Sequence, residues 1–484
     1  MPSSQPQYYK NTLQPLQTNQ STLQQTLQEL QRAVIQGTKV LQAGSRAPVS
    51  PSDHSSIYSG TAGIALAFLR LDRQKDVLGE TKPPDFARLA NERIIPAGDV
   101  KLPPLGYMSP VGSSLGPLVV RILAALEHSG QSVSQSDIKL LNTAVQRSLS
   151  HGHVVSSSSE DHIRGVDEVL YGRAGLLWAV VNIRHHAFGN IDIEGNIGSL
   201  FDAIPKLVEA IIDGGRRGAR DYIENYGGKG ALPLMWVYKD ERYSLGAVHG
   251  IAGILTILLS CEVEELNPYL PLIAETITGL CRISIANDGH LPSSIPSRSR
   301  SRGSPLVQIC HGAPGLLTLL ATARKNNHLR TYWKSEWDEA IHLGAERVWQ
   351  EGLLSKGGSL CHGLTGNAWS LLALHESFEL DSHAEGNEKS DYFLSRALAL
   401  LLLARETPPY STALDISSGY DFRMPDRPYS LYEGLSGELC AWAEACVVVQ
   451  ARLCNEVGQT EGQQAKEKAL GIPCLGGNGV RGVM

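Results

Sequence analysis

The chain has 484 residues, of which 42% are hydrophobic and 19% are charged, and 48 are glycine, above the usual share of about 7%. The formal net charge is -6, so the chain lacks the positive surface that nucleic-acid phosphates require. The glycines follow no three-residue period and core-forming residues are plentiful, which excludes a collagen-like or disordered chain. At about 150 residues per domain, the length alone suggests roughly three domains.

The longest apolar run, Ala397 to Ala404, has eight residues, far fewer than the ~18 of a membrane span. We therefore expect no transmembrane segment. The first residues lack the basic start and apolar core of a signal peptide. Eight cysteines in 484 residues, without a dense framework, are typical of a reduced intracellular protein. These features together predict a cytoplasmic protein.

The first 47 residues predict a short leader followed by an amphipathic helix. Ser21 and Gln24 have the spacing of a capping box at the start of that helix. The apolar residues after them fall at helical spacing: Leu23, Leu27, Leu30 and Val34. The Ser/Pro-rich stretch from Arg46 to Ser56 then predicts a loop.

Beyond this loop a Gly-x-x-Gly step recurs, each time followed at once by an apolar helical run. The copies begin at Gly60, Gly172, Gly250, Gly312, Gly363 and Gly434, and a looser copy spans Gly112 to Gly116. Repeats of a fixed kind indicate an array of structural units, each here long enough for two helices. The run after each glycine pair is apolar almost all round, which is typical of a helix buried on both sides.

The segments between these runs carry one apolar stripe each. One example has its stripe at Ile138, Leu141, Val145 and Leu149 and a candidate N-cap at Ser134. Alternation of fully buried and one-faced helices predicts an all-α fold, an α/α toroid (barrel) of seven inner and seven outer helices. Strand-like alternation is almost absent. The toroid is one domain over residues 48–460, between the leader (1–47) and a divergent tail (461–484), and an open solenoid is the structural alternative.

Three copies carry reactive side chains directly before the first glycine: Val248-His249-Gly250, Cys310-His311-Gly312 and Cys361-His362-Gly363. If the repeats superpose around a ring, these side chains converge near one rim. Thiolates and imidazoles that converge on one point suggest zinc. The other cysteines are expected to be buried packing residues: Cys261, Cys281, Cys440, Cys446, Cys454 and Cys474.

The sequence resembles the lanthionine synthetase C-like (LanC-like) family, in particular its eukaryotic branch. The matching segments are YSGTAGIAL, LYGRAGLLWA, GAVHGIAGIL, ICHGAPGLL, LCHGLTGNAW and SLYEGLSGEL. The resemblance implies an α/α toroid with one zinc ion held by Cys310, Cys361 and His362, which leaves a fourth position open. It also implies an acid/base role for His249. We assign only an auxiliary role to His311, which stands where bacterial members tend to carry another polar residue.

The reaction that the resemblance implies is the addition of a thiol to dehydroalanine or dehydrobutyrine in peptides or proteins. Coordination to zinc holds the thiol as the reactive thiolate, and His249 can deliver a proton to the α-carbon. In the eukaryotic branch the implied thiol is glutathione. Lys356 and Arg423 match family cations that hold it, and cations suit its two carboxylates.

Other functions remain open at this stage. The same residues could serve a non-catalytic glutathione- and zinc-binding adaptor in redox or signalling control, for which His249 would be dispensable. A peptide macrocyclase would need a precursor peptide. A glycosidase needs two facing carboxylates, and Glu168, Glu433 and Asp426 form no convincing pair. The sequence assigns no role to the Arg/Ser loop 297–302 or to the tail.

Overall fold

A computed structural model describes most of the chain. The described residues are 5–45, 56–79, 83–95, 100–127, 132–156, 163–188, 197–239, 242–296, 305–379, 385–457 and 471–475. The Arg/Ser loop 297–302 and most of the tail 461–484 lie outside these ranges.

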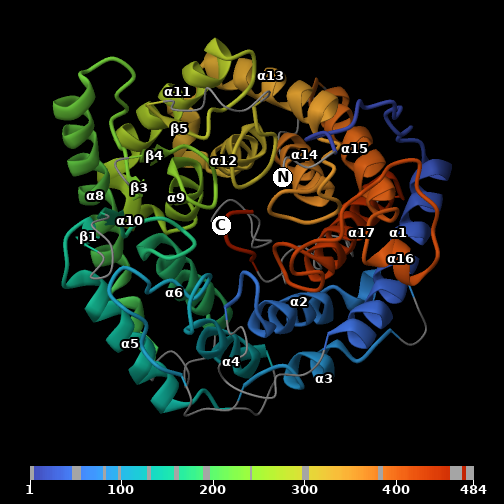
Figure 1. Ribbon diagram of the computed structural model, residues 1–484, viewed down its shortest axis with the longest axis horizontal. Helices are drawn as coiled ribbons and strands as arrows, with labels where there is room; N and C mark the ends of the chain where they lie inside the picture. The colour runs from blue at the N-terminus through green and yellow to red at the C-terminus, as the bar shows by residue number, and fades with distance from the viewer. Residues whose placement is uncertain are drawn as a thin grey trace.

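The helices form a closed ring (Figure 1). Each inner helix contacts the next one along the chain, and the last of them, α17, contacts the first, α2. The inner helices are α2 (Thr61–Arg73), α4 (Gly116–Glu127), α6 (Arg173–Ala187), α9 (Ile251–Leu258), α12 (Ala313–Lys325), α14 (Leu364–Glu379) and α17 (Leu435–Val457). This closure confirms the predicted α/α toroid over an open solenoid.

An outer layer of helices surrounds the inner one, as Figure 1 shows. Its most extensive contacts with the inner layer join α1 to α17 and α15 to α14. The outer helices are α1 (Gln20–Gly44), α3 (Phe86–Asn91), α5 (Gln135–Leu149), α8 (Ile204–Tyr226), α11 (Leu270–Ala286), α13 (Ser335–Glu351) and α15 (Glu385–Ala404). The described part of the chain thus holds the seven inner and seven outer helices that the repeats predict.

Burial separates the two layers as the apolar patterns predict. Every residue of α9 is buried, whereas α5 buries the stripe that includes Ile138, Leu141 and Val145 and exposes its opposite face. Short helical turns complete the layers: η1 (Lys75–Val77), α10 (Val263–Leu266), η2 (Asn267–Tyr269), η3 (Asn327–Tyr332) and α16 (Tyr410–Ala413). Among the described residues, one stretch, Val263–Ala286, is long and apolar enough to span a membrane by length and composition, but half of its most apolar window is buried.

Of the two predicted helix starts, that of α5 is confirmed and that of α1 is wrong. The Ser134 side chain accepts a hydrogen bond from Asp137 N and caps α5, as expected. At α1 the capping box on Ser21 and Gln24 is wrong, because the helix begins at Gln20 and the Asn19 side chain accepts from Thr22 N instead. An asparagine is as good an N-cap as a serine, and here the N-cap stands two residues before the predicted one.

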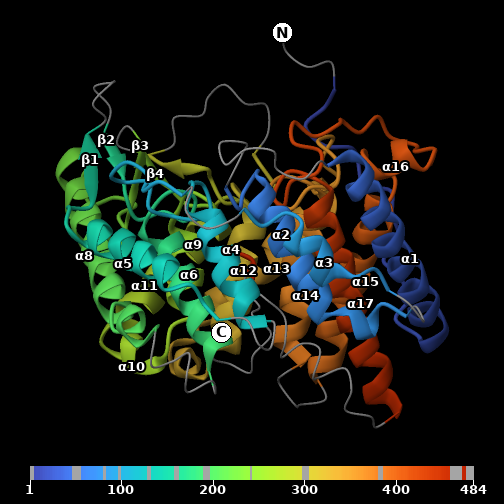
Figure 2. The same cartoon turned by 90° about the horizontal axis from the view of Figure 1, so that it is seen from below.

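A small antiparallel sheet lies at one end of the ring (Figure 2). Its strands are β1 (Val154–Ser156), β2 (Ile163–Gly165), β3 (Val237–Lys239), β4 (Arg242–Ser244) and β5 (Ser294–Ile295), paired in this order. The sequence did not predict this sheet, because strands of two or three residues are too short to show alternation. The sheet is formed by segments that precede α6, α9 and α12, so it borders one side of the rim.

In six of the seven motifs the second glycine is required by close packing. A Cβ added at Gly253 would lie 1.6 Å from the carbonyl oxygen of Ala247, six residues earlier. The same clash, at 1.8 to 2.8 Å, would occur in five further copies: Gly63 with Ile57, Gly175 with Val169, Gly315 with Ile309, Gly366 with Leu360 and Gly437 with Leu431. Each loop thus folds back against its own inner helix, and only glycine leaves room for it.

The segment Gly471–Leu475 lies in the middle of the ring (Figure 1). Tyr432 Oη donates to Pro473 O at 2.5 Å, and Trp369 Nε1 donates to Leu475 O at 3.1 Å. The Cys474 thiol donates to Ala247 O at 3.2 Å. The segment is therefore bound to parts of the ring near α9, α14 and α17.

Candidate active site

The loops before the inner helices are joined to one another by backbone hydrogen bonds. Cys361 N donates to Tyr432 O at 2.8 Å, and Cys310 N donates to Cys361 O at 3.2 Å. The next loop is linked in the same way, by Ala247 N donating to Ile309 O at 3.2 Å. These bonds place equivalent positions of successive repeats side by side. They explain why residues far apart in the sequence meet at the rim.

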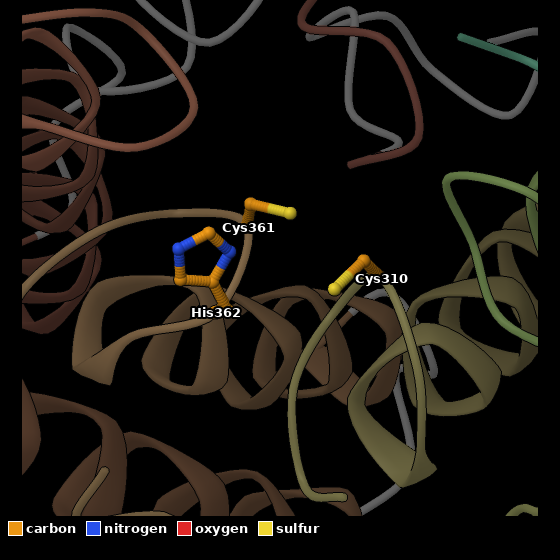
Figure 3. Close-up of side chains that lie close together, drawn as sticks. All are labelled: Cys310, Cys361 and His362. Carbon is orange, nitrogen blue, oxygen red and sulfur yellow. The ribbon is translucent and has the colours of Figure 1, made fainter. Parts of the chain in front are cut away.

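Cys310, Cys361 and His362 meet in this way. Their ligand atoms all lie within 4.8 Å of one another, and Figure 3 shows the two thiols and the imidazole facing a common space. Both cysteines are buried, with exposed fractions of 6% and 1%. Donors around a tetrahedral zinc ion lie roughly 3.5 to 4 Å apart, given bonds of about 2.0 to 2.3 Å. Within the described residues, these three make up the one group of His, Cys, Asp or Glu side chains that could hold a metal ion.

The two thiols influence each other strongly. A hydrogen bond from Cys361, together with His362 and His311, lowers the pKa of Cys310 well below its usual value. The hydrogen bond to Cys310 and burial raise the pKa of Cys361 well above its usual value. Two buried thiolates this close would repel each other, and a cation between them would relieve that repulsion.

Each sulfur also accepts a hydrogen bond from a side chain outside the group. Gln308 Nε2 donates to Cys310 Sγ at 2.9 Å, and Tyr58 Oη donates to Cys361 Sγ at 2.9 Å. Tyr58 in turn stacks on Tyr432, with ring centroids 4.8 Å apart. Such donors orient a thiolate and disperse its charge.

His249 is held by a buried carboxylate. Its Nδ1 lies 3.1 Å from Glu168 Oε2, and the Glu168 side chain is only 2% exposed. Glu168 also accepts from the backbone N–H groups of Leu170 and Tyr171, at 3.0 and 2.6 Å. A carboxylate in this position holds the proton on Nδ1 and leaves Nε2 for exchange with a substrate.

Aromatic rings surround His249. The Tyr238 ring lies 4.4 Å from it between centroids, His311 lies 6.0 Å away and Tyr171 6.5 Å away. His311 directly follows Cys310 in the chain, so its ring lies between His249 and the cluster of Cys310, Cys361 and His362. His249 and His311 thus lie at one site with the three candidate metal ligands, as the sequence predicts.

Lys356 and Arg423 lie at one edge of the rim. Arg423 N donates to Ser355 O at 2.9 Å, which brings the two chain segments together next to Lys356. The Arg423 side chain donates through Nε to Gln5 Oε1, so the first described residue also reaches this edge. Lys356 is exposed. The structure therefore brings both predicted cations to one place.

Sequence reasoning did not assign the supporting residues Glu168, Gln308 and Tyr58. The repeat contains a signal that could have found them. Glu168 and Gln308 both stand four residues before the first glycine of their motif, and Tyr58 stands two before it, in the register of Cys310 and Cys361. Alignment of the repeats on their glycines would place all of these side chains along one rim.

Several known proteins are similar to this sequence. The family model described as Lanthionine synthetase C-like protein matches residues 51–445. A zebrafish (Danio rerio) protein named glutathione S-transferase LANCL1 is 29% identical over 83% of this chain and 84% of its own. The Arabidopsis thaliana LanC-like protein GCL1 is 28% identical over 59% of this chain and 56% of its own.

Among solved structures, nisin cyclase covers 80% of this chain and 85% of its own at 16% identity, with a TM-score of 0.44.

Proposed function

This chain belongs to the lanthionine synthetase C-like family, and from that premise we propose that it is a zinc-dependent transferase that adds glutathione to dehydroalanine or dehydrobutyrine residues of peptides or proteins. The observation that carries the proposal is the Cys310, Cys361 and His362 group beside the His249–Glu168 pair. The name of the zebrafish relative, a glutathione S-transferase, supports the thiol.

The three-residue group suits zinc by the chemistry of its donors. Two thiols and an imidazole are preferred zinc ligands, and three protein ligands leave one position for a substrate. Zinc held there would keep a substrate thiol deprotonated and in place. Gln308 and Tyr58 would orient the two sulfur ligands through their hydrogen bonds, each 2.9 Å long.

His249 and Glu168 supply the proton of the addition. A sulfur–carbon bond forms at the β-carbon as the carbon–carbon double bond opens, and the α-carbon then takes up a proton. Because Glu168 holds Nδ1 of His249, Nε2 is the atom that carries this proton to the α-carbon. A positioned acid of this kind contributes roughly 10² to 10⁴ in rate.

Lys356 and Arg423 would hold the carboxylates of glutathione. They lie at one edge of the rim, and Lys356 comes five residues before Cys361. Glu433 lies close enough to His362 and Lys356 to interact with both. This proximity supports a glutathione that engages the two cations and presents its thiol to Cys310, Cys361 and His362.

The test is to incubate the zinc-loaded protein with glutathione and a dehydroalanine peptide and to follow the mass of the peptide. We expect an adduct with the mass of one glutathione. Metal-free protein and a Cys310→Ala variant should give no adduct above the uncatalysed rate. Absence of the adduct with zinc-loaded protein, where a positive control reacts, would refute the proposal.

His249→Ala separates a transferase from a non-catalytic glutathione- and zinc-binding adaptor. A transferase should keep its zinc and its affinity for glutathione in this variant but lose turnover. An adaptor would bind both ligands equally well in the two proteins and turn over in neither.

A further inference from the structure

Arg164, on β2, is clamped between two tyrosine rings. Its guanidinium carbon lies 4.7 Å from the centre of the Tyr107 ring and 4.9 Å from that of Tyr171. The two rings contact each other edge to face, 5.2 Å apart. Such stacking fixes the plane of the guanidinium and the directions of its N–H groups.

This guanidinium has N–H groups that are not used in hydrogen bonds within the described residues. Within the described residues, Arg164 Nη1 is shielded from water and has no hydrogen-bond acceptor. No carboxylate of the same residues forms an ion pair with Arg164, in contrast to Arg173, which pairs with Asp167 at 2.8 Å. Buried N–H groups in proteins almost always have a partner. A fixed cation with an unmatched donor is therefore suited to an oxygen of a ligand.

The aromatic residues around Arg164 extend to the acid/base residue His249. Tyr171 contacts both Arg164 and His249, and Tyr238, on the neighbouring strand β3, contacts His249 at 4.4 Å. Arg164 is paired with Lys239 of β3 in the sheet. All four side chains of this aromatic clamp, Tyr107, Arg164, Tyr171 and Tyr238, are only partly buried, so a ligand can reach the exposed part of each.

The clamp lies across the rim from the cations assigned to glutathione. Lys356 and Arg423 come before α14 and α17, whereas β2 and β3 lie on the side of α8 and α9, across the ring (Figures 1 and 2). An addition between two molecules needs a place for each of them, with the acid/base group between. The two cations provide one place. The aromatic clamp is the candidate for the other.

We propose that the aromatic clamp binds the acceptor peptide, with Arg164 donating to an oxygen of that peptide and the tyrosines packing against its planar dehydroamino acid. This inference rests on the proposed function for the identity of the acceptor. The conjugated double bond and amide of a dehydroamino acid are flat, and flat groups stack well on tyrosine. The oxygen is a backbone carbonyl or the terminal carboxylate, both of which accept from a guanidinium.

The test measures binding of a fluorescein-labelled dehydroalanine peptide, kept inert by the absence of any added thiol, to the full chain by anisotropy. We expect Arg164→Gln to weaken binding about tenfold. The matched control Lys239→Gln removes a cation from the adjoining strand outside the clamp and should change binding less than twofold. Comparison of a free with an amidated peptide end tells the carboxylate from the carbonyl, since only the carboxylate predicts weaker binding of the amide.

Glutathione binding distinguishes the two sites. Arg164→Gln should leave the affinity for glutathione within twofold, whereas Lys356→Gln should weaken it. Equal peptide binding by Arg164→Gln and the parent protein, or no binding of the peptide to the parent, would overturn the inference. If Arg164→Gln does not fold, Tyr107→Leu should weaken peptide binding at least threefold, and unchanged binding there would overturn it too.

Because the binding assay needs no turnover, it can fail separately from the proposed function. If the parent protein forms the glutathione adduct and Arg164→Gln has the same KM for the dehydroalanine peptide, the transferase stands and the aromatic clamp is not its acceptor site. If the parent forms no adduct but binds the inert peptide through Arg164, the clamp stands and the transferase does not.

Discussion

The loops before α2 and α14 have the same geometry and different chemistry. In one, a Cβ at Gly63 would lie 2.0 Å from Ile57 O, and in the other a Cβ at Gly366 would lie 1.8 Å from Leu360 O. Two residues before the first glycine, the first loop carries Tyr58 and the second carries Cys361, and these two side chains are hydrogen-bonded to each other. The glycines therefore build the scaffold in both loops, while one position decides what each loop contributes to the site.

The largest expected effect tests the shared scaffold. Gly63→Ala and Gly366→Ala should each destabilise the fold by about 3 kcal/mol or more, because the new methyl group would overlap a backbone carbonyl oxygen. Denaturant unfolding monitored by circular dichroism measures the change. Gly152→Ala is the control, since a Cβ there meets no atom within 4 Å. If only the cysteine-bearing loop were sensitive, the two loops would not share one structural role.

Loss of a thiol tests the difference between the loops. Cys361→Ala should lower bound zinc from about one ion per chain to a small fraction, because a site with two protein ligands loses most of its affinity. Metal analysis of purified protein measures it. The control Cys446→Ala removes a buried thiol of α17 and should keep the full zinc content. Equal zinc in both variants would contradict the assignment of Cys361.

The next largest effect is expected on the rate of adduct formation, through the acid/base pair His249 and Glu168. We expect His249→Gln to lower the rate of adduct formation by roughly 10² to 10⁴, and Glu168→Gln to lower it by roughly ten- to a hundredfold, the usual cost of losing an orienting partner. Initial rates at saturating glutathione measure both. His311→Gln, one repeat further along the rim, should have a smaller effect than His249→Gln. The opposite order would make His311 the main proton donor.

The smallest expected effect tests whether the loop that carries Tyr58 supports the metal ligand Cys361 of the other loop. Tyr58→Phe keeps the stacking on Tyr432 but removes the hydroxyl that donates to Cys361. We expect zinc affinity to fall about tenfold, the lower end of the range for lost hydrogen bonds to ligands. Competition with a chelator measures it. Unchanged affinity would mean that the tyrosine loop supports the ring and not the metal group.

Much of the site could be predicted because its residues stand next to repeated glycines. Cys310, Cys361, His362 and His249 each occupy the last or second-last position before a Gly-x-x-Gly step, so a ring of repeats brings them together. Arg164 and Tyr238 stand outside the motif, on strands of three residues. No periodicity marks such strands, and their place beside His249 depends on how β2 pairs with β3.

The glycine excess and the alternation of buried and one-faced helices determined the toroid from the sequence alone, since a close-packed turn needs glycine wherever it recurs and a helix shows its burial in its period. The sequence also determined which thiols and imidazoles are equivalent. Only the tertiary structure decided which groups support them. Glu168 meets His249, and Tyr58 meets Cys361 across 303 positions of the chain. Glu168 and His249 belong to successive repeats, whereas Tyr58 reaches Cys361 because closure of the ring brings the first repeat beside the last, where Tyr432 N donates to Tyr58 O.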